Sequence, residues 1–143
     1  MNWQTLSTNS PYKTAVAIQE ALQQGRIAEA GSGLEELIDA LSKSEKRALK
    51  SQLVRLMLHI IRWHSQPERR SLSWVASIED ARDEIGDIRE ETPSLNAQVI
   101  DDLWTKAFVI AKRNAEAEIG KRSSVEGLTW QDVFETVYAL DRQ

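Results

Sequence analysis

The chain contains no cysteine, only six glycines and three prolines, and no long uncharged apolar run. The absence of cysteine excludes disulfide bonds, thiolate zinc sites and cysteine nucleophiles. No span of about 18 apolar residues is present, which argues against a membrane-spanning helix. The first residues also lack the basic and apolar regions of a signal peptide. We therefore expect a cytoplasmic protein without a membrane partner.

A strong charge of one sign is also missing. The sequence has 18 Lys and Arg against 22 Asp and Glu, a formal net charge of −4. This balance does not direct the chain toward nucleic acid or anionic lipid. The sequence also lacks a glycine-rich phosphate loop and a dinucleotide-binding fingerprint. We predict no catalytic residue and no cofactor.

The sequence does have helical periodicity over nearly its whole length. Ser10 and Pro11 are typical of an N-cap and a first-turn proline, and Gly25 is typical of a helix end. Thr92–Pro93 and Gly120 end two later helices. The predicted helices span 10–24, 34–41, 43–66, 71–91, 95–119 and 129–140.

This pattern predicts an all-α, single-domain bundle of five to six helices, with the third and fifth helices central. Residues 1–10 are expected to be loosely ordered, and 121–128 to form a loop. Ser42 and Glu45 are spaced as a capping box that separates the second helix from the third. The apolar residues expected to face inward on the first two helices are Ala15, Ile18, Leu22, Leu34, Leu37, Ile38 and Leu41.

The third predicted helix is apolar over most of its circumference. Its polar residues make one narrow stripe, formed by Gln52, Arg55, His59, Arg62 and Gln66. Such a helix is either central to a bundle or buried by a second subunit. Six helices need not cover both this face, at 53–63, and the apolar face at 104–111. We therefore predict a non-enzymatic interaction module that forms a homo-oligomer or binds another protein.

The two histidines do not have the spacing of a metal site. His59 and His64 are five residues apart, which places them roughly 140° apart around a helix. Metal-binding pairs on a helix usually lie four residues apart. Arg55 and Arg62 also flank His59, and their charge opposes a bound cation. We predict no metal site, and no catalytic triad follows from serines that are merely close to His64 in sequence.

The stretch HIIRWHSQPERRSLSW, at 59–74, concentrates unusual residues around one turn. Pro67 disfavours helix at the preceding residue, so the third helix ends there. Arg69 and Arg70 suit the partial negative charge of that helix end and can satisfy its last carbonyls. We predict a structural corner that carries one candidate binding surface, the binding corner. Its residues are His59, Arg62, Trp63, Gln66, Arg69, Arg70 and Trp74. A ligand or an enzymatic activity there would require an open pocket.

Charge is distributed in blocks. Residues 43–70 carry eight Lys or Arg against two acidic residues, and residues 79–91 carry seven acidic residues against two arginines. Antiparallel packing of the third and fourth helices would let the blocks neutralise each other, at about 0–1 kcal/mol for each exposed pair. The alternative is a patch that binds nucleic acid or another polyanion. That patch consists of Lys43, Lys46, Arg47 and Lys50.

The segment SEKRALKSQLVRLMLHIIRWHSQPERRSLSW, at 44–74, closely resembles the signature of the bacterial family called domain of unknown function 29. Its members carry a similar S-E-K-R-A-L segment, a helix ending in H-x-x-K/R-W, and then Q-P-E-R-R-S-x-S-W. Weaker similarity runs from LQQGR through TPSL to LTWQDVF. The segments GLEELIDAL and SSVEGLTW depart from the family pattern.

The resemblance implies an all-helical soluble domain with no assigned activity. It marks the motif positions as candidates without giving any of them a catalytic role. In this sequence they are His59, Arg62, Trp63, Gln66, Pro67, Glu68, Arg69, Arg70, Ser71, Ser73 and Trp74.

Overall fold

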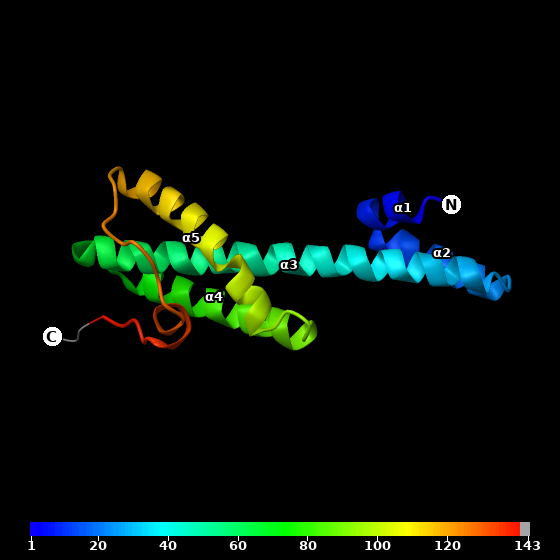
Figure 1. Cartoon of the computed structure of the whole chain (residues 1–143). Coiled ribbons are helices and arrows are strands. Elements are labelled where there is room, and N and C mark those ends of the chain that lie inside the picture. The colour runs from blue at the N-terminus through cyan, green and yellow to red at the C-terminus, as the bar shows by residue number, and fades with distance from the viewer. Residues whose placement is uncertain (141–143) are drawn as a thin grey trace. The chain divides into compact units, whose positions relative to one another are not determined.

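The computed structural model describes residues 1–140, which form five α-helices, two short helical turns and no strand. The all-α prediction of five to six helices is confirmed. The chain divides into two compact units, residues 1–47 and 48–143, and each is described by itself. Helix α3 (Ile27–Ser65) contributes residues to both (Figure 1). The prediction of a single domain stays a prediction.

The first unit contains α1 (Trp3–Asn9), α2 (Pro11–Gln23) and the beginning of α3. Ser10 caps α2 as predicted, because its hydroxyl accepts a hydrogen bond from the Lys13 N–H at 3.2 Å. Residues 1–10, for which we expected little order, include α1, whose N-cap Asn2 accepts from the Thr5 N–H at 3.1 Å. The small core of this unit is made of Trp3, Ile18, Ala21 and Ala30.

Helix α3 is continuous where the sequence predicted a break and two helices. The GSG stretch at 31–33, after which the second helix was predicted to begin, lies inside α3, and the expected capping box at Ser42 and Glu45 does not interrupt the helix. Ser42 is exposed inside the helix, where a serine can face water without ending the hydrogen-bond ladder. Lys43 Nζ lies 2.9 Å from Asp39 Oδ2, an ion pair across this stretch with the spacing that supports a helix.

The apolar faces of α2 and early α3 are only partly covered. Ile18 is buried and Leu37 packs against the small core. The prediction that the whole apolar set faces inward is wrong for Ala15, Leu22, Leu34, Ile38 and Leu41, which are exposed. Leu34 and Ile38 each come one position after a covered residue of α3. This places them about 100° further around the helix than the covered residues. They therefore lie outside the contact with α1 and α2.

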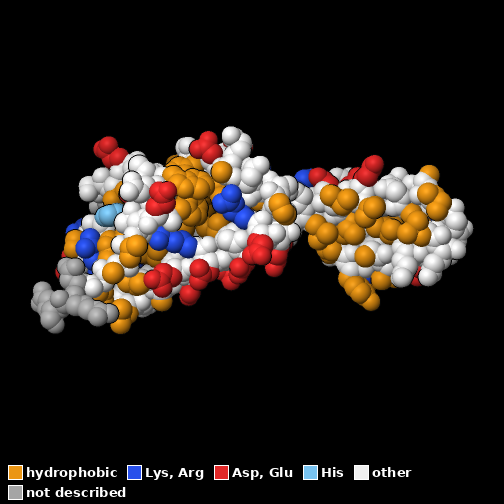
Figure 2. Space-filling view, turned by 90° about the horizontal axis from the view of Figure 1, so that it is seen from below, with side chains coloured by type: hydrophobic (Ala, Val, Ile, Leu, Met, Phe, Trp, Pro, Cys, Tyr) orange, Lys and Arg blue, Asp and Glu red, His pale blue; other side chains and the backbone are white. Residues whose placement is uncertain are grey.

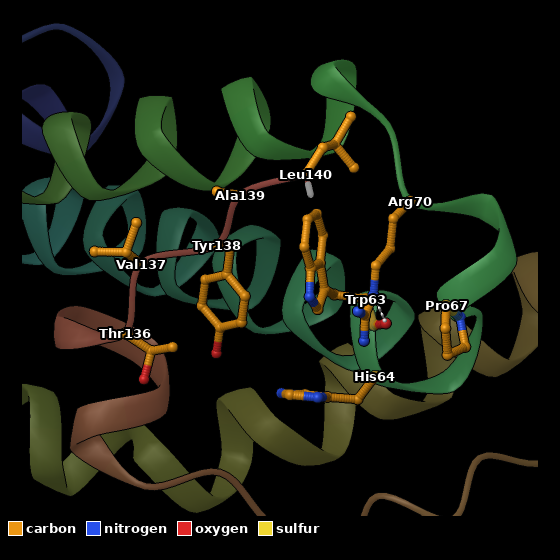
Figure 3. Close-up of a pocket in the computed structure, with 9 residues that line it drawn as sticks. All are labelled: Trp63, His64, Pro67, Arg70, Thr136, Val137, Tyr138, Ala139 and Leu140. Carbon is orange, nitrogen blue, oxygen red and sulfur yellow. Dashed lines mark hydrogen bonds between the residues drawn. The ribbon is translucent and has the colours of Figure 1, made fainter. Parts of the chain in front are cut away.

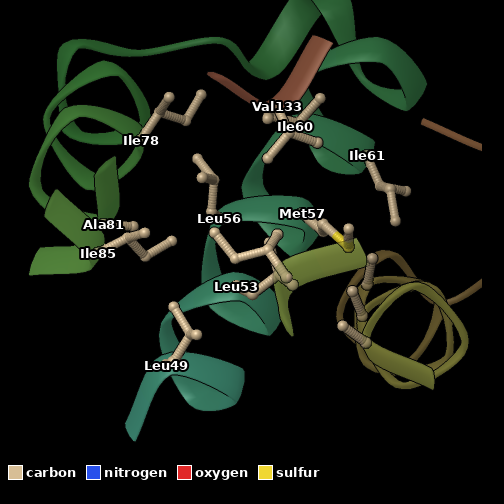
Figure 4. Close-up of a cluster of buried hydrophobic side chains, with 14 of the residues drawn as sticks. Leu49, Leu53, Leu56, Met57, Ile60, Ile61, Ile78, Ala81, Ile85 and Val133 are labelled. Atoms are coloured by element: carbon tan, nitrogen blue, oxygen red, sulfur yellow. The ribbon is translucent and has the colours of Figure 1, made fainter. Parts of the chain in front are cut away.

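The second unit is built on the later part of α3, with α4 (Leu72–Glu91) running beside it and α5 (Ala97–Ile119) crossing it obliquely (Figure 1). Helix α4 packs through one seam of buried residues, which are Ile78, Ala81, Ile85 and Ile88. The α3 residues at the centre of this core are Leu49, Leu53, Leu56, Met57, Ile60 and Ile61 (Figure 4). The third and fifth predicted helices are thus central, as expected.

The packing covers most of the two apolar faces that led us to predict an oligomer. Trp63 is only 5% exposed, and Ala107 and Ala111 are fully buried. The face at 53–63 and the inner side of α5 are covered within the unit by α4, by each other and by the C-terminal segment, which inserts Val133. On the outer side of α5, Trp104, Phe108 and Ile110 are half-buried and Val109 is exposed.

The last predicted helix, at 129–140, is reduced to the turn η2 (Gln131–Glu135). Its N-terminal box forms as expected: the Thr129 N–H donates to Asp132 Oδ2 at 2.8 Å, and the Asp132 N–H donates to Thr129 Oγ1 at 3.1 Å. The turn ends because the Asp132 and Val133 carbonyls, which a longer helix would use, accept hydrogen bonds from Arg82 and Tyr138. The backbone is extended at Thr136.

Candidate functional site

The predicted corner connects α3 to α4 through a short turn, η1 (Pro67–Arg69). Helix α3 ends at Ser65. The proline predicted an end at residue 66, one residue later. Ser71 begins α4, and its hydroxyl accepts a hydrogen bond from the Trp74 N–H at 3.2 Å. The corner is therefore specified by local signals: a proline to end one helix and a serine to cap the next.

Arg70 and Trp63 are joined by two contacts on one side of the corner. Arg70 Nε donates to the Trp63 carbonyl oxygen at 2.8 Å, so one of the last carbonyls of α3 is satisfied as predicted. The Arg70 guanidinium carbon also lies 4.8 Å from the centre of the Trp63 ring, within the range of a cation–π contact. These contacts fix the plane of the guanidinium and leave its Nη groups for other partners.

Arg62 holds the opposite side of the corner. Its Nη1 lies 2.7 Å from Glu118 Oε2 on α5, and its guanidinium carbon lies 4.5 Å from the centre of the Trp74 ring. Arg62 thus ties α3 to both α4 and α5. It uses cation–π stacking on one neighbour and an ion pair on the other.

His59 is half-buried and Gln66 is buried, and neither residue lines a cavity in the described part of the chain. His59 Nδ1 donates to the Arg55 carbonyl oxygen at 3.1 Å. Desolvation lowers the pKa of His59, and the positive charges of Arg55 and Arg62 lower it further. The hydrogen bond to the Arg55 backbone and the charge of Glu118 act in the opposite direction. Gln66 is buried at the end of α3. His59 is therefore a half-buried, polar-stripe histidine.

The C-terminal segment lies beside the corner, a contact that the sequence analysis missed. Tyr138 is buried and meets Trp63 edge-on, with ring centres 5.6 Å apart, and His64 edge-on at 6.0 Å. Figure 3 shows the tyrosine reaching from this segment toward the end of α3. The sequence carries no alternating signal here, because residues 137–140 are all apolar; in the structure Val137 and Ala139 are exposed and Tyr138 between them is buried, which is the period of an extended chain.

A cavity of about 480 Å³ opens between the corner and this segment (Figure 3). Trp63 and Arg70 are the members of the predicted binding corner that line it. Arg62 and Trp74 pair elsewhere, and Arg69 is exposed. The structure therefore does not gather the seven predicted residues into one pocket. It adds Pro67, which only the family motif marked as a candidate, together with His64 and the segment 136–140, which were not among the candidates.

Arg82 secures the C-terminal segment from α4. Its Nε donates to the Val133 carbonyl oxygen at 2.8 Å and its Nη2 to that of Asp132 at 3.4 Å. The guanidinium carbon lies 5.5 Å from the centre of the Tyr138 ring, whose hydroxyl donates to the Asp132 carbonyl oxygen at 2.7 Å. We call this group of contacts the tyrosine clip. It determines where one wall of the cavity lies.

The predicted polyanion patch is not a uniform basic surface. Lys43 is paired with Asp39, whereas Lys46 and Arg47 are exposed and make no ion pair within residues 1–140. Lys50 is half-buried, and desolvation together with the ammonium group of Lys106 lowers its pKa. No ion pair joins the basic residues of α3 to the acidic residues of α4 in the described part of the chain. The expected pairing of these two charge blocks is therefore not formed as ion pairs.

The residues that the structure describes include neither a cluster of metal ligands nor a helix able to cross a membrane. No three His, Asp or Glu side chains converge as ligands for a metal ion there. No helix in residues 1–140 combines the length and apolar character needed to cross a membrane.

Comparison with known proteins agrees with the sequence signature at the corner. No curated protein and no solved structure matches the chain significantly. A family model, described as Domain of unknown function DUF29, matches residues 12–141. This match covers both the corner and the C-terminal segment that packs against it. The chain therefore belongs to the DUF29 family.

Proposed function

We propose that this protein is a helical interaction module that self-associates through an apolar surface on α2 and early α3. We call this surface the N-terminal face. It consists of large apolar side chains with these exposed fractions: Leu22 50%, Ile27 65%, Leu34 48%, Ile38 59% and Leu41 44%. This row of exposed side chains is the observation that carries the proposal. Figure 2 shows hydrophobic side chains gathered in a band over the part of the chain on the right of the view.

Energetics favour a partner for this face. Full burial of a leucine or isoleucine side chain contributes about 1.5–3 kcal/mol, so the half-exposed residues offer about 1 kcal/mol each. Two copies of the face together would contribute on the order of 10 kcal/mol. Association costs about 4–15 kcal/mol, so the expected affinity is modest rather than very tight. Large exposed apolar patches on soluble proteins are typical of interaction surfaces, which supports the proposal.

A second copy is the partner that best fits this surface. The face is made of two helices, and pairing two such faces gives a four-helix arrangement in which each face buries its equivalent. Charge does not oppose the pairing, because residues 1–47 carry five basic and six acidic residues, a difference of −1. Two charges near the face, Arg26 and Lys43, are neutralised locally by Glu29 and Asp39.

Sedimentation equilibrium of the wild-type chain and of Ile38→Glu tests the proposal. Position 38 is exposed, so the substitution should leave the fold intact while placing a charge in the interface. Leu72→Glu is the matched control, because Leu72 is 73% exposed and lies on α4. We expect a concentration-dependent dimer for wild type and Leu72→Glu, and a monomer for Ile38→Glu. A wild-type monomer at every concentration would contradict the proposal, and so would dissociation by both variants.

Binding of nucleic acid or another polyanion ranks second. It is supported by Lys46 and Arg47, which are exposed on α3 outside any ion pair within residues 1–140. Phosphate contacts release counterions, so the affinity for a short mixed DNA should fall steeply with salt. At a given salt concentration, the affinity for DNA should be lower in a Lys46→Gln, Arg47→Gln double variant than in the single variant Lys13→Gln. An affinity that is equal at low and moderate salt would count against this second function.

A further inference from the structure

We propose that the cavity between the corner and the C-terminal segment binds a small organic oxyanion, with Arg70 and His64 as the recognising groups. The cavity volume, about 480 Å³, lies within the range of about 300–1,000 Å³ that is typical of small-molecule sites. The segment 136–140 forms one side, and Trp63, His64 and Arg70 form the other (Figure 3). The site is independent of the N-terminal face.

Arg70 is held in the geometry that oxyanion recognition needs. Its Nε is committed to the Trp63 carbonyl at 2.8 Å, and the Trp63 ring lies against the guanidinium plane. Both Nη groups are thus presented on a fixed plane, and the planar fork can donate two parallel hydrogen bonds to a carboxylate or phosphate. No carboxylate of residues 1–140 forms an ion pair with Arg70. Arg70 thus uses only one of its donor groups, Nε, to hold the corner.

His64 supplies a second donor on the same cavity wall. It is exposed, and its ring lies edge-on to Tyr138 rather than within the core. Neither of its ring nitrogens hydrogen-bonds a protein group in the described part of the chain. Imidazole N–H groups are good donors to carboxylate and phosphate oxygens. Two donor side chains, one at the end of α3 and one in the corner, therefore line the same cavity.

The remaining lining defines the body of the ligand. Pro67, Val137 and Leu140 supply apolar surface, and Trp63 and Tyr138 add aromatic surface from the two sides. An oxyanion attached to a small ring fits this combination, because its charged end meets the donors while its ring contacts the apolar lining. Carboxylate and phosphate share this chemistry.

The test is a titration of the full ¹⁵N-labelled chain by NMR with benzoate, phenyl phosphate and neutral benzamide. We expect benzoate, phenyl phosphate or both to shift the side-chain signals of Trp63, His64 and Arg70 Nε, and benzamide to be at least tenfold weaker. Binding of benzoate alone identifies a carboxylate site, and binding of phenyl phosphate alone identifies a phosphate site. Benzamide that binds as well as the anions, or no saturable shift by either anion, would overturn the proposal.

Variants separate recognition from general charge. His64→Gln and Arg70→Lys should each weaken anion binding about tenfold, because a charge-assisted hydrogen bond is lost or misaligned. Arg69→Gln is the control, since Arg69 is an exposed neighbour that does not line the cavity. His64 is also exposed, so its variant reports on binding even if Arg70→Lys perturbs the corner. An equal loss in Arg69→Gln would show that the effect is only net charge and would contradict the site.

Discussion

Gly33 lies so close to Trp3 that a Cβ atom at position 33 would be 2.8 Å from two carbons of the indole ring. It would also lie 2.9 Å from Ile18 Cγ1. The missing side chain lets α1 and α2 approach α3. Glycine ordinarily weakens a helix, but at position 33 the packing inside the helix requires it.

Replacing Gly33 with alanine should destabilise the first unit. Alanine is favoured over glycine in a helix by about 1 kcal/mol, but the clash with a bulky ring costs about 1–3 kcal/mol, so the net effect is a loss. Gly31→Ala is the matched control, because a Cβ there meets nothing within 4 Å and should stabilise the helix. Urea denaturation followed by circular dichroism measures both. Equal stabilisation by the two substitutions would contradict the packing described for Trp3.

Replacing Arg82 with methionine should release the tyrosine clip. Two hydrogen bonds to the Asp132 and Val133 carbonyls would be lost, and bonds from a charged donor contribute about 1.5–3 kcal/mol. We expect the Thr136 amide, which donates to the Gln131 carbonyl at 2.8 Å, to exchange with solvent at least tenfold faster. Amide hydrogen exchange measures this directly. Arg113→Met, at an exposed position of α5, is the control and should leave the exchange rate of that amide unchanged. An unaltered exchange rate in Arg82→Met would show that the tyrosine clip does not hold the segment.

Alkaline pH should loosen the same segment through Tyr138. Burial raises the pKa of Tyr138 to about 12, the Asp132 carboxylate adds to this, and the Arg82 guanidinium opposes it. Because the folded-state pKa lies above the ordinary value of 10.0, the stabilisation is complete below pH 10 and is lost as the pH rises toward 12.

The absorbance of ionised tyrosine measures this titration. The chain has two tyrosines, so Tyr12→Phe leaves Tyr138 as the single reporter. We expect its midpoint near pH 12 while the protein is folded, and a smaller loss of stability above pH 10 in Tyr138→Phe. A midpoint near 10 in folded Tyr12→Phe would contradict the burial of this hydroxyl.

Local signals accounted for most helix boundaries. Ser10, Ser71 and Thr129 each accept a hydrogen bond at a helix start, and Gly120 ends α5 in the left-handed conformation. Pro67 placed the corner within one residue. These features act within a few residues of backbone, through a fixed φ angle, a missing N–H or a nearby hydroxyl. They can therefore be predicted from sequence.

Sequence signals did not predict helix ends correctly where a residue pattern is compatible with a cap but does not force one. Ser42 and Glu45 have capping-box spacing, but nothing around them forces the backbone out of the helix, and α3 continues. Thr129 and Asp132 do begin a helical turn, yet η2 ends after Glu135 because Arg82, some 50 residues away in sequence, donates to its carbonyls. A short helix gains too little by itself to resist such competition.

The sequence by itself determined the helical class, the corner at Pro67 and the membership of the DUF29 family, because these depend on local patterns. Only the tertiary structure decided which apolar faces stay open and what lines the cavity. Both α3 stripes are apolar, and burial depends on which distant segment packs against each. The stripe containing Leu53 and Ile60 is covered within its unit, and the stripe containing Leu34 and Ile38 is not. Likewise, Tyr138 reaches Trp63 across 75 residues of chain, a long-range contact that no local periodicity encodes.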